Sequence, residues 1–234
     1  YTPEQIQNRL NDLKAKVMKT PLRNVRWDFA LNRSDLKGAY LLGEVLILET
    51  LTRIIYAISC DDGMPLWALQ LERSLSFAPC RNHNSYFFVA ADIVYQTDNK
   101  GNLLKKIVLP IAPSCAPAVS ERLFFIGSWA DTRIYAFDIQ TFDRYQVYRA
   151  RAGIQGKPLV LDRYLYFASQ DSNVYCYDVG GTLSWKYATE DSVIAGPVLA
   201  GELLLVSSTD YALYALDRVT GRVMWKCETA GPLD

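Results

Sequence analysis

A pattern that recurs about every 40 residues constrains the fold of this chain more than any other feature of its sequence. In its clearest column an apolar residue precedes a tyrosine, and these tyrosines are spaced by 39, 40, 40 and 39 residues. The column consists of Tyr56, Tyr95, Tyr135, Tyr175 and Tyr214. A fixed period of this length indicates a repeat architecture in which each copy is one supersecondary unit.

A turn follows each tyrosine and begins at an acidic column three residues later, which reads Ser59, Asp98, Asp138, Asp178 and Asp217. The turn itself carries a glycine in four copies, Gly63, Gly101, Gly181 and Gly221, with Phe142 in that place in the third. An aspartate here can accept hydrogen bonds from the turn backbone, and glycine permits a positive φ. The sequence therefore predicts a tight turn at the end of one strand of each copy.

A tryptophan column lies four residues beyond the turn and reads Trp67, Lys105, Gln146, Trp185 and Trp225. We expect the indole rings to pack between neighbouring units, with each ring N–H bonded to a carbonyl of the neighbour. Because the second and third copies lack tryptophan, we expect less regular contacts there.

Each copy holds four short strands separated by hairpin signals. In the fifth copy the strands are predicted at about 193–199, 203–208, 212–217 and 222–228. The second strands are strongly apolar, which suits burial on both faces; they lie at 45–48, 86–90, 123–126, 164–168 and 203–206. Four-stranded antiparallel units repeated in this way predict an all-β fold, a β-propeller with five complete blades.

The segment from Ala215 to Trp225 reads A-x-D-x-x-T-G-x-x-x-W and resembles the tryptophan-docking motif of quinoprotein-like (PQQ-repeat) β-propellers. Gly181–Trp185 and Gly63–Trp67 are degenerate copies, and the resemblance covers about residues 38–230. It is specific for the fold and weak for function, because the motif is structural. The family includes PQQ-dependent dehydrogenases and non-catalytic scaffolds of the BamB type.

Residue patterns typical of catalysis are scarce. The chain has a single histidine, His83, in a polar turn where a shared catalytic base is not expected. It has no adjacent cysteines and no C-x-x-C-H, two features that the resemblance would imply for a PQQ enzyme. No zinc or calcium spacing occurs either. We therefore expect no enzymatic activity, no cofactor and no bound metal, and free, mostly buried thiols at the five cysteines.

A strand without partners is predicted at 26–31, because Trp27 lies 40 residues before Trp67 and so falls in the tryptophan column. One hypothesis is that the chain is part of a propeller with six or more blades, or an incomplete ring. The alternative is a closed five-bladed ring with 26–31 packed outside it. In either case we divide the chain into an N-terminal helix and linker, 1–23, and a propeller, 24–234.

The N-terminal segment is predicted to be an amphipathic helix from Thr2-Pro3 to about Met18, since Thr2 and Gln5 form a capping box. Its narrow apolar stripe comprises Ile6, Leu10, Leu13 and Val17. The favoured interpretation is docking on the side or end of the propeller, and the alternative is a partner or membrane-surface helix.

Loop residues supply the candidate binding site. Trp129 lies in the loop between the second and third strands of the third copy, and acids recur in the same loops. The candidates are Trp129, Asp131, Asp171, Asp210 and Tyr211. Exposed aromatics on a rigid scaffold are typical anchors for a partner, although packing of Trp129 over a neighbouring blade is the favoured interpretation. The acids have two interpretations, turn capping or a shared cation, of which turn capping is favoured.

These features favour a non-catalytic scaffold for protein or peptide binding or assembly, BamB-like by analogy. The alternatives are an extracytoplasmic ligand-sensing or regulatory domain and a fragment of a PQQ-dependent dehydrogenase. With 25 basic and 25 acidic residues the chain has no net charge, so nucleic acid is not an expected partner. No apolar run is long enough for a transmembrane helix. The resemblance alone implies a periplasmic or other extracytoplasmic location.

Overall fold

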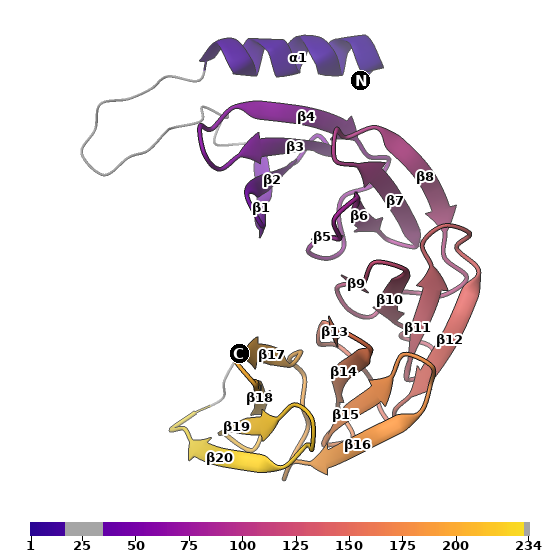
Figure 1. Cartoon of the computed structure of the whole chain (residues 1–234). Helices are drawn as coiled ribbons and strands as arrows, with labels where there is room; N and C mark the ends of the chain where they lie inside the picture. Colours follow the sequence, from indigo (N-terminus) through magenta and orange to yellow (C-terminus); the bar gives the residue numbers. More distant parts are fainter. Residues whose placement is uncertain (17–34, 232–234) are drawn as a thin grey trace. The chain divides into compact units, whose positions relative to one another are not determined.

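The computed structural model describes residues 1–16 and 35–231 (Figure 1). The predicted strand at 26–31 and the last predicted helical residues, Val17 and Met18, lie outside these ranges. The chain forms two compact units, residues 1–108 and 109–234, each of which is described by itself. Among the described residues, no helix is long and apolar enough to cross a membrane.

In the described part of the chain the strands form five four-stranded antiparallel sheets, each in the order of the sequence. Residues 1–108 hold two of them. Sheet 1 consists of β1 (Leu36–Leu42), β2 (Val45–Thr50), β3 (Ile54–Ser59) and β4 (Pro65–Gln70). Sheet 2 consists of β5 (Cys80–Arg81), β6 (Ser85–Ala90), β7 (Ile93–Asp98) and β8 (Leu103–Val108).

Residues 109–234 hold the other three sheets. Sheet 3 consists of β9 (Ala118–Val119), β10 (Leu123–Gly127), β11 (Arg133–Asp138) and β12 (Arg144–Arg149). Sheet 4 consists of β13 (Leu159–Leu161), β14 (Tyr164–Ser169), β15 (Asn173–Asp178) and β16 (Leu183–Ala188). Sheet 5 consists of β17 (Val198–Ala200), β18 (Leu203–Ser208), β19 (Ala212–Asp217) and β20 (Val223–Glu228). These are the five predicted blades.

The predicted first strand of the fifth copy is too long, because β17 covers only Val198–Ala200 instead of 193–199. Pro197 has no N–H to give to a ladder. Gly196 approaches the backbone of the preceding repeat so closely that a Cβ on it would lie 2.1 Å from the Lys157 carbonyl oxygen. This segment is therefore held by a backbone contact between repeats rather than by pairing within its own sheet.

The predicted turn chemistry between the third and fourth strands is confirmed. Asp217 accepts hydrogen bonds from the backbone N–H of Val219 at 3.1 Å and of Thr220 at 2.7 Å. Gly221 follows at a φ of +70°. In the third copy Phe142 takes the same conformation at +62°, and its ring packs against Phe124 and Phe137. The aromatic contacts hold a residue that carries backbone strain there.

The second strands of sheets 2, 3 and 4 are almost wholly buried, as predicted, whereas in sheets 1 and 5 the third strand has more buried residues. All six residues of β6 and all five of β10 are buried. Sheets 1 and 2 share a core that includes Ile47, Trp67 and Phe88. In the second unit, one core joins sheets 3 and 4, and another joins sheets 4 and 5. The apolar character of these strands follows from packing on both faces.

Helix α1 (Pro3–Lys16) begins with the predicted capping box. The Thr2 N–H donates to Gln5 Oε1 at 2.9 Å, and the Gln5 N–H donates to Thr2 Oγ1 at 3.3 Å. Leu10 is buried against sheet 1, in a cluster with Leu48, Ile54, Tyr56 and Ile58. Figure 1 shows α1 running alongside β4, and Leu10 and the half-buried Leu13 dock on the first blade.

The tryptophan column joins neighbouring sheets. Trp67 Nε1 donates to the carbonyl of Asn99 at 3.2 Å, and Trp185 Nε1 donates to that of Arg218 at 3.1 Å. In the third copy the contact differs, as expected, because Gln146 Nε2 donates at 2.9 Å to the carbonyl of Gly180, one residue beyond the position that the tryptophans use. The carbonyl at the equivalent position, that of Val179, accepts from Tyr148 Oη at 2.6 Å instead.

Candidate functional site

The loops between the second and third strands, here called the B–C loops, carry every candidate residue predicted from the sequence. In the second unit these loops are 128–132, 170–172 and 209–211. Because the strands of each sheet run up and down, these loops lie at the end opposite to the two hairpin turns of the sheet. The candidates therefore share one end of sheets 3, 4 and 5.

Each acidic candidate accepts a hydrogen bond from the tyrosine four residues later. Tyr175 Oη donates to Asp171 at 2.6 Å, and Tyr214 Oη donates to Asp210 at 2.7 Å. Asp131 has the same contact with Tyr135 and also pairs with Arg133. The same tyrosine–aspartate hydrogen bond therefore recurs in all three loops.

Two of these carboxylates also hold the chain that arrives from the preceding sheet. Asp171 accepts from the backbone N–H of Arg151 at 2.7 Å, just beyond β12. Asp210 accepts from the backbone N–H of Glu190 at 3.0 Å, just beyond β16. Among the described residues, no group of three or more His, Cys, Asp or Glu side chains could hold a metal ion. These contacts support turn capping as the role of Asp171 and Asp210.

The contact between Asp210 and Tyr214 shifts the pKa values of both side chains. Burial disfavours ionisation of Asp210, but hydrogen bonds from Tyr214, Glu190, Ser208 and Ala212 outweigh it, so its pKa lies below the usual value. Burial raises the pKa of Tyr214, and its hydrogen bond to Asp210 raises it further. The pair is therefore a neutral phenol bonded to a carboxylate at neutral pH.

The tips of these loops hold left-handed residues that sequence reasoning missed. Thr132, Ser172 and Tyr211 have φ values of +56°, +63° and +63°. Each carbonyl accepts from a backbone N–H just beyond the fourth strand of its sheet, and for Tyr211 the donor is Thr229 at 2.7 Å. None of the three is glycine, so the sequence did not suggest a positive φ. The aspartate before each of them does indicate a turn, since its side chain can accept hydrogen bonds from the turn backbone.

Trp129 and Tyr211 are the exposed aromatics at this end, with 60% and 52% of their surface accessible. The favoured prediction for Trp129 was packing over a neighbouring blade, and its exposed ring does not agree with that prediction. Its backbone N–H donates to the Ala112 carbonyl at 3.0 Å, which fixes the main chain while the ring remains open.

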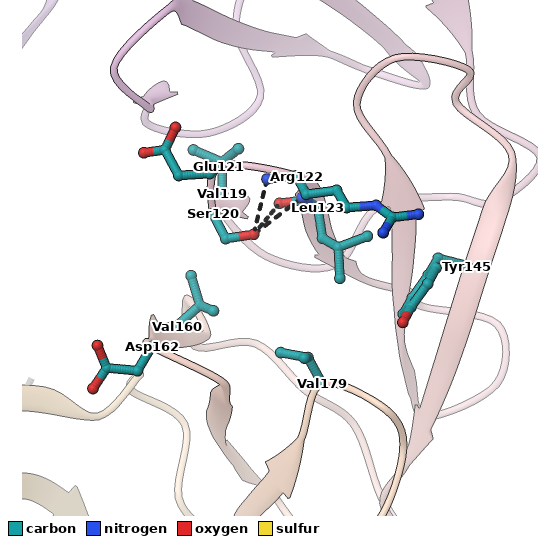
Figure 2. A pocket seen from close by; sticks show the side chains of 9 residues that line it. All are labelled: Val119, Ser120, Glu121, Arg122, Leu123, Tyr145, Val160, Asp162 and Val179. Carbon is teal, nitrogen blue, oxygen red and sulfur yellow. Dashed lines mark hydrogen bonds between the residues drawn. The ribbon is translucent and has the colours of Figure 1, made fainter.

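A groove at the opposite end of sheets 3 and 4 was not predicted (Figure 2). Its volume is about 560 Å³, within the range of ligand pockets. Valine and leucine side chains line its floor, and Glu121 and Asp162 lie on one side of it in Figure 2. Arg122 donates to Asp138 at 3.1 Å and lies over the ring of Tyr145. The residues that line the groove come from separate segments of the chain, so no local sequence motif could reveal the groove.

His83 and the cysteines do not extend either site. His83 is exposed in the turn before β6, and its carbonyl accepts from Asn99 Nδ2 at 2.8 Å. All five cysteines lie in the described residues and none forms a disulfide bond; three are buried, Cys60 is half-buried and Cys227 is exposed. Burial raises the pKa of the Cys115 and Cys176 thiols to about 11, so neither is a ready nucleophile.

The chain is similar to known propellers in sequence profile and in fold. Residues 130–233 match the profile of a family described as outer membrane protein assembly factor BamB. The crystal structure of BamB from Moraxella catarrhalis superposes with a TM-score of 0.64 at 22% identity, over 83% of this chain and 64% of that one. No curated protein sequence matches.

The computationally designed protein Ika8 superposes with a TM-score of 0.66 at 16% identity, over 86% of this chain and 64% of its own. At these identities the structural likeness shows the fold alone. In both cases the chain spans less than two thirds of the length of the protein it resembles.

Proposed function

We propose that this chain, which belongs to the BamB-like PQQ-repeat β-propellers, is a non-catalytic scaffold that binds a protein or peptide through the B–C loops of its second unit. The exposed ring of Trp129, in the loop that follows the fully buried strand β10, carries the proposal. Aromatic anchors of this kind supply much of the energy of protein interfaces.

Hydrogen bonds hold the main chain of the loop around Trp129. The Ser128 N–H donates to the Arg133 carbonyl at 2.9 Å, and the Ala130 N–H donates to Ser128 Oγ at 3.3 Å. Strand β10, which leads into the loop, is buried throughout. Because few additional groups would have to be immobilised on binding, the entropy cost would be small and the affinity correspondingly higher.

The partner class follows from the family. The matching family is described as an assembly factor for outer membrane proteins. We therefore propose that the scaffold acts outside the cytoplasm and binds unfolded β-barrel segments, whose alternating apolar side chains complement the exposed aromatics.

The test measures binding of the full chain to a labelled, urea-unfolded outer membrane β-barrel protein after dilution. Trp129→Ala should weaken binding by about tenfold or more, since truncation of a hot-spot aromatic typically costs about 2 kcal/mol or more. Tyr145→Ala removes another exposed aromatic, at the groove, and should leave binding unchanged. Equal loss in both variants, or no binding by the parent chain, would reject the proposal.

A second measurement addresses the enzyme alternative. The chain is titrated with PQQ and Ca²⁺ in a calorimeter. A scaffold should give no saturable heat, whereas stoichiometric binding of the quinone would assign the chain to the dehydrogenase branch.

A further inference from the structure

The groove between sheets 3 and 4 is acidic on one side and apolar along its floor (Figure 2). Glu121 comes from the turn between β9 and β10, and Asp162 comes from the equivalent turn between β13 and β14. Both acids are exposed, and the side chain of Asp162 is 81% accessible. The floor includes three half-buried valines, Val119, Val160 and Val179. An occupant of this groove must therefore combine a positive charge with an apolar surface.

The arginine that follows each of these acids is paired with an aspartate of its own sheet. Arg122 donates to Asp138 at 3.1 Å, and Arg163 donates to Asp178 at 2.6 Å. Both aspartates belong to the turn between the third and fourth strands and do not line the groove. Among the residues that line the groove, Arg122 is the only base. The lining therefore carries two acids and one base, and that base is bonded to a carboxylate outside it.

Sheets 4 and 5 show which side chain fills the equivalent place in the next pair of sheets. Val179 of sheet 4 and Arg218 of sheet 5 both follow the turn aspartate. The N–H of each donates to a carbonyl just before the second strand of its sheet, that of Arg163 or that of Glu202. The Arg218 guanidinium donates to Glu202 at 2.6 Å and lies 3.8 Å from Asp162. An arginine thus joins acids from the turns of two neighbouring sheets.

Between sheets 3 and 4 the residue at the position of Arg218 is Val179, whose side chain carries no charge. We infer that this groove binds an arginine side chain of a partner protein, presented in an extended segment with apolar residues on both sides of the arginine. The guanidinium lies between the two acids, as that of Arg218 does in the next pair of sheets. In an extended segment alternate side chains share a face, so the apolar residues two positions away lie on the valine floor.

Arginine suits the groove better than lysine for two reasons. Its planar guanidinium presents donors in a fork that can pair with two carboxylates, and it is more weakly hydrated than an ammonium group. The groove lies at the end of sheets 3 and 4 opposite to the B–C loops, so this site is separate from the one proposed around Trp129. A scaffold with both sites could hold two segments of a partner at once.

The test measures binding of the full chain to a fluorescein-labelled peptide with blocked ends and the sequence Ser-Val-Ser-Arg-Ser-Val-Ser. Fluorescence anisotropy should show saturable binding that weakens as sodium chloride rises from about 50 to about 500 mM, since exposed charges are screened. Citrulline in place of arginine keeps the shape of the side chain without its charge and should weaken binding by about tenfold. Lysine keeps the charge without the fork and should weaken binding by about threefold.

Variants of the chain locate the bound peptide. Asp162→Asn should weaken binding by about threefold, as expected for an exposed ion pair. Glu44→Gln, at an exposed acid in the equivalent turn of sheet 1, should have no effect. Val179→Arg copies the arrangement of Arg218 into the groove, so its guanidinium should compete for the acids and abolish binding. Val219→Arg adds the same charge at a position that is 64% exposed in a turn of sheet 5, and should leave binding unchanged.

Equal binding of the arginine and citrulline peptides would overturn the proposal, and so would full binding by a folded Val179→Arg chain. Circular dichroism reports whether that variant is folded; if it is not, the comparison of Asp162→Asn with Glu44→Gln decides. Argininamide that binds as tightly as the peptide would also overturn the proposal, because the groove would then take small guanidinium compounds. Trp129→Ala should not change binding of this peptide, so the result is independent of the assay for the B–C loops.

Discussion

The indole ring of Trp185 lies directly over Gly221 of the next sheet, where a Cβ would come within 2.5 Å of the ring. The indole N–H of Trp185 is bonded to the carbonyl of Arg218 in the same turn. One side chain thus fixes both the distance and the register between sheets 4 and 5. The turn glycine has two roles, since it also supplies the positive φ of the turn.

Gly221→Ala should therefore destabilise the protein more than Gly201→Ala does. Both changes place alanine at a positive φ, which costs about 1–2 kcal/mol. Only Gly221→Ala adds a steric clash, which should destabilise the protein by about a further 1–3 kcal/mol. Urea unfolding of the two variants measures the difference, and equal midpoints would contradict the packing role of Gly221.

Two tryptophans of the same column should respond differently to truncation. Trp67→Ala removes a buried ring and should lower the free energy of unfolding by about 3–5 kcal/mol. Trp225→Ala removes a ring that is 42% exposed and should lower it by about 1 kcal/mol or less. Thermal and urea unfolding of the full chain provide the measurement. A loss of similar size at Trp225 would mean that its ring is already covered.

The aspartate column should make the protein sensitive to acid. Hydrogen bonds from the backbone and side chain of Thr220 hold the pKa of Asp217 below its usual value of 3.8. A carboxylate with a lowered pKa contributes stability above its usual pKa and loses it as the pH falls through the folded-state value. The stability difference between the parent and Asp217→Asn should thus be constant at neutral pH and shrink below about pH 4.

Unfolding free energies measured from pH 2 to pH 7 test this dependence. Asp12→Asn, at an exposed position of α1, is the matched control and should show no such trend. A pH-independent difference for Asp217→Asn would assign the turn's stability to backbone conformation rather than to the carboxylate.

Alkaline pH should destabilise the protein through its buried tyrosines. Burial raises the pKa of Tyr166 to about 12, and its hydroxyl donates to the Arg218 carbonyl at 3.1 Å. For a raised pKa the contribution to stability is complete below the usual value of 10 and is lost as the pH rises through 12. Tyr166→Phe should therefore weaken the pH dependence between 10 and 12.

Ultraviolet absorbance and circular dichroism, recorded in parallel during an alkaline titration, test this prediction. Tyr145→Phe is the control, because Tyr145 is 46% exposed. Ionisation of Tyr166 at its usual pKa, with no loss of structure, would contradict the burial argument.

The repeat pattern was sufficient to predict most of the local structure. The apolar runs and turn residues placed β18 and β19 at their observed bounds, and the Asp–Gly spacing predicted the turn at Asp217. Such features depend on residues close in sequence, and hydrogen bonds within a turn do not require knowledge of the rest of the fold. The candidate loops were located for the same reason.

Tertiary contacts decided the role of each predicted side chain. Gln146 stands in the tryptophan column but donates to the Gly180 carbonyl, one residue beyond the position that the tryptophans use. Asp210 accepts hydrogen bonds from Tyr214 and from the backbone beyond the preceding sheet. Trp225 has the sequence signature of a buried residue, but burial requires a covering surface that its own repeat cannot provide. The sequence by itself determined the blades; the packing between blades determined which of their repeated positions are buried and which are exposed.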